Sequence, residues 1–158
     1  MLEAAVRAPD HGKLRPWRFL VVRGGARLEL AQLYAEAALR REPGAAPDKI
    51  EKERAKPMRS PLTIGVVAKV TENHKIPVVE QVLSGGAAAM NILNAAWAMG
   101  FAAKWVTGAN AYDPMFLQAL GVSAPDQLLG FLQIGRPAGT VPAPERPDPG
   151  QFTTEWHR

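Results

Sequence analysis

Cationic and turn-forming residues gather in the segment from Arg7 to Phe19, which reads R-A-P-D-H-G-K-L-R-P-W-R-F. Its prolines, glycine and aspartate favour an irregular loop, and the apolar run that follows predicts a buried strand. The loop carries Arg7, His11 and Lys13, whose side chains suit an anionic ligand. Taken alone, these residues fit a solvated basic loop equally well.

A second segment, W-V-T-G at positions 105 to 108, follows a predicted strand and ends at a glycine turn. Backbone N–H groups at such a turn can donate to an electron-rich ring edge without any ionisable side chain. By itself the pattern is weak evidence, because an ordinary exit from a strand into a turn explains it better.

Several kinds of chemistry lack the residues that they need. The sequence contains no cysteine, which excludes disulfides, thiolate metal sites and cysteine nucleophiles. The spacing of His11, His74 and His157 does not suit metal ligands, so we expect no metal site. The glycine-rich phosphate loops and the G-x-S-x-G nucleophile motif are also missing, which leaves hydrolases and kinases without support.

Composition indicates one globular domain covering residues 1–158, with 47% apolar residues and a net charge of +4. The basic residues are spread along the chain without interleaved aromatic residues, so we do not expect nucleic-acid binding. The first residues do not resemble a signal peptide, and no apolar run reaches transmembrane length. We therefore expect a cytoplasmic protein without membrane association.

Hydrophobic periodicity and turn residues predict alternating strands and helices that must hold these two segments in place. The expected strands are Trp17–Arg23, Leu62–Val70, Phe101–Val106 and Leu128–Ile134, and the expected helices are Ala26–Arg41, Asp48–Lys56, Val78–Met99 and Asp113–Leu120, with residues 1–6 as the end of a further helix. Asp48 and Glu51 predict an N-terminal cap for the second helix, whose charged residues we expect to form a solvated surface. The prolines after residue 136 predict an extended tail over residues 137–158, either disordered or wrapped over a partner.

The helix predicted over Val78–Met99 is apolar almost all round. A helix without a polar face is buried in a core or in a subunit interface, and we favour an interface for part of it. Gly85 and Gly86 inside it are unfavourable for helix formation. They indicate either close approach by a ligand or a second backbone, or tight helix packing.

Taken together, the motifs resemble one family. R-A-P-D-H with P-W-R-F, then A-K-V-T-E-N-H-K-I-P-V-V-E-Q, G-F-A-A-K-W-V-T-G, G-F-L-Q-I-G-R-P and R-P-D-P-x-x-F, are similar to the FMN-dependent nitroreductase family. The closest resemblance is to its short bacterial NAD(P)H nitroreductases, and it covers nearly the whole chain in order.

This resemblance implies an α+β fold with a central, mostly antiparallel sheet surrounded by helices. It also implies an interlocked homodimer with two FMN sites across the interface. The long helix would then lie at the centre of the dimer, and the C-terminal tail would embrace the partner subunit.

The resemblance also assigns the site residues. Arg7 and His11 match FMN-contacting positions, and Trp105, Val106 and Thr107 match the segment that lines the isoalloxazine, with the amides of Thr107 and Gly108 facing N5 and O4. NAD(P)H would reduce FMN and leave, and the reduced flavin would then pass electrons to a nitroaromatic, quinone or similar acceptor. Because the flavin carries the reaction, no catalytic side chain is predicted. Lys13 or Lys104 would add positive charge near the ring.

One family feature is missing from the sequence. Related proteins carry an R-R-S motif on an N-terminal helix that binds the FMN phosphate, whereas Arg40 and Arg41 belong to a different element and precede Glu42. We therefore expect either that the missing segment lies upstream of Met1 or that the protein is naturally truncated, and we expect weaker FMN binding without the segment. The alternative is a dimeric binding protein of the same fold that is not catalytic or holds no flavin.

Overall fold

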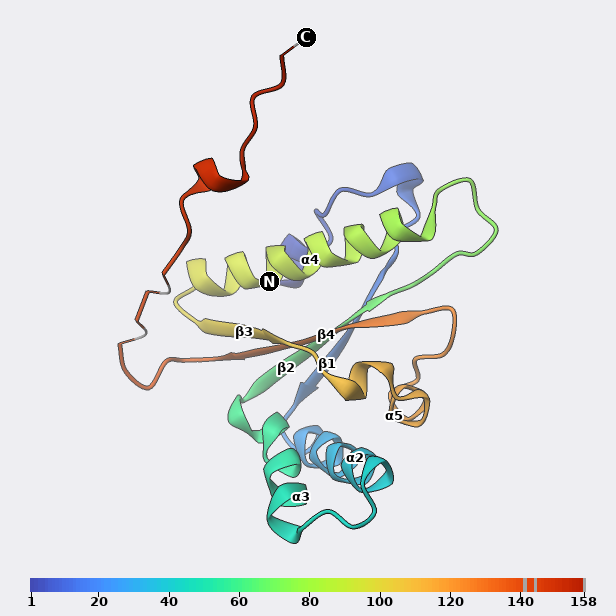
Figure 1. Ribbon diagram of the computed structural model, residues 1–158, viewed down its shortest axis with the longest axis vertical. Helices are drawn as coiled ribbons and strands as arrows, with labels where there is room; N and C mark the ends of the chain where they lie inside the picture. Colours follow the sequence, from blue (N-terminus) through green and yellow to red (C-terminus); the bar gives the residue numbers. More distant parts are fainter. Residues whose placement is uncertain (141, 144, 158) are drawn as a thin grey trace.

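The computed structural model describes residues 1–140, 142–143 and 145–157, and a four-stranded sheet forms its centre (Figure 1). The strands are β1 (Trp17–Arg23), β2 (Leu62–Ala68), β3 (Ala102–Val106) and β4 (Gln127–Gly135). They are ordered β1-β2-β4-β3, and every neighbouring pair is antiparallel. β2 is therefore a central strand, as its run of buried β-branched residues requires, and β3 is an edge strand.

Helices cover both faces of the sheet, so the predicted α+β fold with an antiparallel sheet surrounded by helices is confirmed (Figure 1). The helices are α1 (Leu2–Ala5), α2 (Ala26–Arg41), α3 (Pro47–Arg54), α4 (Val78–Ala98) and α5 (Pro114–Ala119). One hydrophobic core lies between α1, α4 and the sheet and includes Ile64 and Leu132. The other lies between α2, α5 and the opposite face and includes Val67 and Phe131.

The predicted elements are all present, with boundaries shifted by at most two residues. The predicted cap at Asp48 is wrong. Helix α3 begins at Pro47, and its N-cap residue, Ala46, supplies no side-chain hydrogen bond. Proline is well suited to the first helical position, because its fixed φ fits the helix and the N–H that it lacks would have no partner there. Asp48 therefore lies inside the first turn.

Helix α4 buries only one of its faces in the chain. Gly85 is buried against the sheet, where a Cβ atom would lie 2.7 Å from Leu129 Cδ1, whereas a Cβ atom at Gly86 would meet nothing within 4 Å. The opposite face exposes an apolar stripe of Val79 (62%), Leu83 (65%), Met90 (50%) and Trp97 (82%). The chain itself therefore buries one side of the helix, the predicted burial of another part in a subunit interface stays a prediction, and Gly85 serves close packing of helix on sheet.

After β4 the chain leaves the sheet as a tail that contains one 3₁₀ turn, η4 (Pro149–Phe152) (Figure 1). Phe152 and Trp156 are exposed on it. Parts of the tail prediction fall on residues 141, 144 and 158, which lie outside the described residues. Within the described ranges, no helix combines the length and apolar character needed to cross a lipid bilayer.

Candidate functional site

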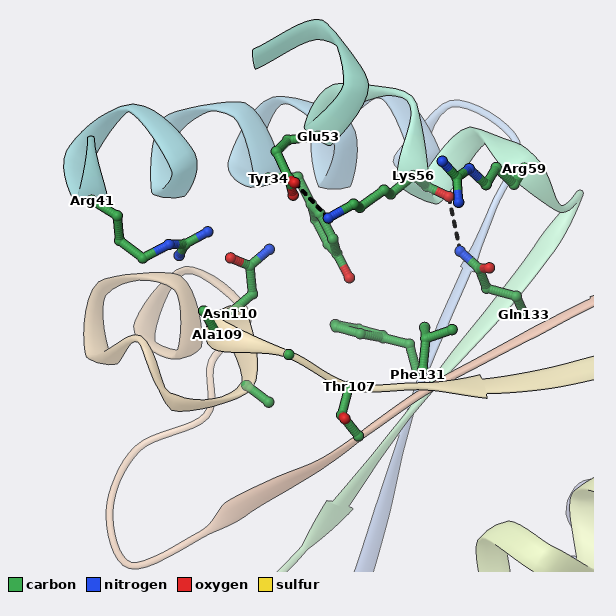
Figure 2. Close-up of a pocket in the computed structure, with 13 residues that line it drawn as sticks. Tyr34, Arg41, Glu53, Lys56, Arg59, Thr107, Ala109, Asn110, Phe131 and Gln133 are labelled. Atoms are coloured by element: carbon green, nitrogen blue, oxygen red, sulfur yellow. Dashed lines mark hydrogen bonds and ion pairs between the residues drawn. The ribbon is translucent and has the colours of Figure 1, made fainter. Parts of the chain in front are cut away.

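A cavity of about 290 Å³ lies where β3 ends, on the side of the sheet that faces α2. Figure 2 shows side chains from several elements pointing into it. They come from α2, the end of α3, the 3₁₀ turn η2 (Lys56–Arg59), the central strand β4 and the 3₁₀ turn η3 (Ala109–Tyr112). The lining residues are Tyr34, Arg41, Glu53, Lys56, Arg59, Val106, Thr107, Gly108, Ala109, Asn110, Ala111, Phe131 and Gln133.

Polar contacts between η2 and β4 fix the roof of the cavity to the sheet. The Gln133 side chain donates from Nε2 to the carbonyl oxygen of Lys56 at 2.8 Å, and Lys56 forms an ion pair with Glu53 (Figure 2). Both charged residues are half-buried. The prediction that the charged residues of this helix form a solvated surface is therefore wrong for Glu53, whose side chain is only 22% exposed.

A bulge in β4 fixes the position of Trp105. The pairing of β2 with β4 shifts between Val66 and Val67, which leaves Leu129 unpaired in that ladder. The carbonyl oxygen of Leu129 accepts a hydrogen bond from Trp105 Nε1 at 3.0 Å. The next residue is Gly130, and a Cβ atom there would lie 2.5 Å from Trp105 Nε1. Only glycine leaves room for the indole at this point.

The segment that follows Trp105 exposes two backbone donors. Among the described residues, the N–H groups of Thr107 and Gly108 have no hydrogen-bond partner, and both residues are exposed. The Gly108 carbonyl accepts from the Ala111 N–H at 2.9 Å, which turns the chain into η3. Gly108 has φ 137°, a conformation that favours glycine. The loop therefore presents two free amides at the rim of the cavity.

The charges around the cavity are set by burial and by neighbouring groups. Burial and then the Glu53 carboxylate raise the pKa of Tyr34 to about 12, which extends the pH range over which its hydroxyl is neutral. Burial alone would raise the pKa of Asp113, but hydrogen bonds from the Phe116 N–H and from Arg40 outweigh it and hold that pKa below its ordinary value. Arg41 also reaches Asp113, at 3.5 Å. Three positive side chains therefore line the cavity against one carboxylate: Arg41, Lys56 and Arg59 against Glu53.

The segment that contains Arg7 and His11 lies on the other face of the sheet, against α4. Ser84 on α4 donates to the carbonyl oxygen of Pro9 at 2.6 Å, and His11 Nδ1 lies 2.6 Å from Glu80 Oε2. Arg7 is exposed beside Asn91 and other residues of α4 in a shallow surface hollow. Polar residues of α4 therefore shape the loop and orient the imidazole of His11.

The sequence-predicted site residues fall into two groups in a single chain. Val106, Thr107 and Gly108 line the cavity, and Trp105 holds their segment in place. Arg7 and His11 lie on the opposite face and contribute nothing to the cavity. The structure of one chain does not bring the six residues together.

Sequence reasoning missed the cations of the cavity. Lys13 and Lys104 were expected near the ligand, but neither lines the cavity, where Arg41, Lys56 and Arg59 stand instead. The position of Lys56 and Arg59 directly before a central strand was the one signal that could have pointed to them. In the described part of the chain, no group of three or more histidine, aspartate or glutamate side chains is arranged to hold a metal ion.

Comparison with known proteins relates the chain to one family. The model of the family described as "Nitroreductase family" matches residues 1–136. "Putative NAD(P)H nitroreductase YdjA" of Escherichia coli K12 is 39% identical over 155 residues, covering 98% of this chain and 84% of that protein. "Putative NAD(P)H nitroreductase" of Haemophilus influenzae is 35% identical over 136 residues, covering 85% of this chain and 73% of that protein.

Solved structures share the fold at low sequence identity. A nitroreductase-like family protein from Bacillus cereus superimposes with a TM-score of 0.78 at 23% identity, covering 97% of this chain and 80% of that chain. A "putative nitroreductase" from Desulfovibrio desulfuricans, solved in complex with FMN, has a TM-score of 0.70 at 22% identity, covering 99% of this chain and 82% of that chain. These similarities support the architecture described above.

Proposed function

The chain belongs to the nitroreductase family and is by that membership an oxidoreductase, and from this premise we propose that it is an FMN-dependent enzyme that takes electrons from NAD(P)H. The observation that carries the proposal is the pair of free, exposed N–H groups at Thr107 and Gly108. The isoalloxazine ring presents nitrogen and oxygen acceptors along one edge, and two adjacent backbone donors suit such an edge.

The residues around these amides fit an electron-rich ring. Arg41, Lys56 and Arg59 supply positive charge behind the segment, against the single carboxylate of Glu53. A positive field favours the reduced flavin, which carries negative charge on its ring. The bound flavin would supply the redox chemistry, accepting a hydride from NAD(P)H and passing electrons to a nitroaromatic, quinone or similar acceptor in a second half-reaction.

The chain's own residues would bind and orient the cofactor. The bulge at Leu129 and the space at Gly130 hold Trp105, and this contact keeps the Thr107 and Gly108 amides in one orientation. No side chain is required as an acid or base in the hydride step, so we assign no catalytic residue.

We also propose that the complete site needs two copies of the chain. Arg7 and His11 match flavin-contacting positions of the family, yet they lie across the sheet from Thr107 and Gly108. A homodimer packed through α4 would bring the Arg7–His11 loop of one copy toward the Thr107–Gly108 segment at the end of the edge strand β3 of the other. The exposed apolar stripe of α4 supports this arrangement, because monomers rarely expose so many large apolar side chains in one row.

The test is FMN binding by the purified chain and by a matched pair of glycine variants. We expect the wild-type protein to quench FMN fluorescence saturably and its flavin absorption to be bleached by NADPH or NADH. Gly108→Ala strains a backbone with φ 137° and shifts the free amides, so FMN affinity should fall about tenfold or more. Gly121→Ala introduces strain at φ 66° away from the cavity and should leave FMN affinity unchanged.

A folded, dimeric protein that FMN does not saturate would contradict the proposal. That result would favour a binding protein of the same fold without a flavin. Equal FMN affinities for the two glycine variants would instead show that the Thr107–Gly108 amides do not face the ring.

A further inference from the structure

The cavity beneath α2 carries an excess of positive charge. Glu53 is already paired with Lys56, so its carboxylate does not balance the remaining cations. Arg41 has only a long contact to Asp113 at 3.5 Å, and the Arg59 side chain forms no hydrogen bond or ion pair within the described residues. Two guanidinium groups without close partners at one opening suit an anionic ligand.

A buried amide without a partner points into the same space. Asn110 is only 7% exposed, and its side-chain oxygen is buried without a hydrogen-bond partner among the described residues. Figure 2 shows the Asn110 amide between the Arg41 guanidinium and the open part of the cavity. The unpaired Oδ1 is an acceptor and requires a donor such as water or a guanidinium N–H, whereas the Nδ2 group of the same amide can donate to an anionic occupant.

The inner wall is aromatic. Phe131 is buried and Tyr34 lies against it, with ring centroids 6.1 Å apart, and the Tyr34 hydroxyl points into the cavity (Figure 2). A tyrosine hydroxyl is neutral at pH 7, so it can donate a hydrogen bond without repelling an anion. The volume of about 290 Å³ suits a molecule of one ring with a small substituent.

We propose that this cavity binds a small aromatic carboxylate, with the carboxylate accepting from Arg41, Arg59 and Asn110 Nδ2 and the ring against Tyr34 and Phe131. This binding site goes beyond the proposed function, since it does not require a flavin. Its occupant would contact Val106 to Gly108 from the α2 side, behind the amides that the proposed function assigns to the flavin.

The test is calorimetric titration of the purified protein with benzoate, acetate and benzyl alcohol. We expect saturable binding of benzoate, with acetate at least about tenfold weaker because it lacks the ring, and no saturable binding of benzyl alcohol, which lacks the charge. Absence of saturable benzoate binding to the folded protein would overturn the proposal. So would equal binding of benzoate and benzyl alcohol.

Variants with matched controls locate the site. Asn110→Asp keeps the side-chain size but places a negative charge beside the ligand, so benzoate affinity should fall by more than about tenfold. Arg41→Gln should weaken binding about tenfold, whereas Arg40→Gln should leave it within about twofold. Both arginines contact Asp113 but only Arg41 lines the cavity, so a purely structural effect would appear in both variants. Unchanged binding in Asn110→Asp and Arg41→Gln would overturn the proposal.

Parallel titrations of flavin-free and FMN-loaded protein separate this inference from the proposed function. Benzoate binding by a protein that does not take up FMN would leave the inference standing while the proposed function fails. FMN uptake without benzoate binding would support the proposed function and overturn the inference. Displacement of benzoate by FMN in a one-to-one manner would assign the cavity to the flavin and overturn the inference.

Discussion

Gly130 is the residue on which the placement of the W-V-T-G segment depends. It has φ 133°, and a Cβ atom there would lie 2.7 Å from the carbonyl oxygen of Val106 and 2.9 Å from Thr107 Cγ2, in addition to the contact with the Trp105 indole. Backbone on the neighbouring strand cannot move aside as a flexible side chain can. The glycine therefore sets how closely β3 and its continuation approach β4.

Replacing Gly130 with alanine should destabilise the protein and displace Trp105. Overpacking costs about 1–3 kcal/mol and the strained backbone about 1–2 kcal/mol more, so we expect a loss of about 2–5 kcal/mol. Urea unfolding measures the loss, and a shift in tryptophan emission reports the indole leaving Leu129. Gly139→Ala, where a Cβ atom would meet nothing within 4 Å, is the control and should be neutral. A Gly130→Ala protein as stable as wild type would refute this account of the segment.

At the scale of elements, Asp113 connects two helices on the α2 side of the sheet. Its carboxylate caps α5 by accepting from the N–H groups of Met115 at 3.0 Å and Phe116 at 3.1 Å, and it forms ion pairs with Arg40 and Arg41 of α2. One side chain thus holds α5 and the end of α2 beside η3. The wall of the cavity that contains Arg41 depends on this contact.

Asp113→Ala should cost about 1–2 kcal/mol at pH 7, because the cap and the ion pairs are lost together. The folded-state pKa of Asp113 is lowered, so its contribution is present above the unfolded pKa near 4 and is lost as the pH falls through the folded pKa. The stability difference between wild type and Asp113→Asn should therefore shrink between pH 7 and pH 3 in urea titrations. A difference that stays constant with pH would show that the charge of Asp113 contributes nothing.

Local signals explain which elements could be predicted. The helix predicted over Asp113–Leu120 is present, and its start has a local cause, since Asp113 caps it and Pro114 takes its first position. The same reasoning failed at Asp48, since Pro47 already takes the first helical position. The W-V-T-G segment was found because its glycine follows a strand directly.

The cavity could not be predicted from the same kind of evidence. Tyr34, Lys56 and Asn110 come from three separate elements, and they meet only because the sheet order β1-β2-β4-β3 places β3 at an edge beside α2 and η2. Nothing in the spacing of these residues along the chain encodes that order. Likewise, helical periodicity showed that α4 is apolar on several sides, but not which side the chain itself buries.

At the scale of the whole molecule, the two faces of the sheet carry different halves of the expected flavin site. The α2 face holds the cavity and the free amides, and the α4 face holds Arg7 and His11 next to the exposed apolar stripe. Gly86 lies within that stripe by helical spacing and leaves open space above the helix. A second α4 could approach closely at this point. Close approach by a second backbone therefore suits Gly86, whereas tight packing within the chain accounts for Gly85.

A charge placed in the stripe should separate the subunits without unfolding the chain. Leu83 is 65% exposed in the single chain, so Leu83→Glu disturbs no core contact, but it would bury a carboxylate at the proposed interface at a cost of about 3–5 kcal/mol. Light scattering after size exclusion should show a dimer for wild type and a monomer for Leu83→Glu, with unchanged circular dichroism. Leu28→Glu is the matched control, because Leu28 is 63% exposed on α2, outside the stripe, and its variant should remain dimeric. The proposed flavin site needs Arg7 and His11 from a second copy, so Leu83→Glu should also lose FMN affinity. A monomeric wild type that binds FMN tightly would contradict the two-copy site.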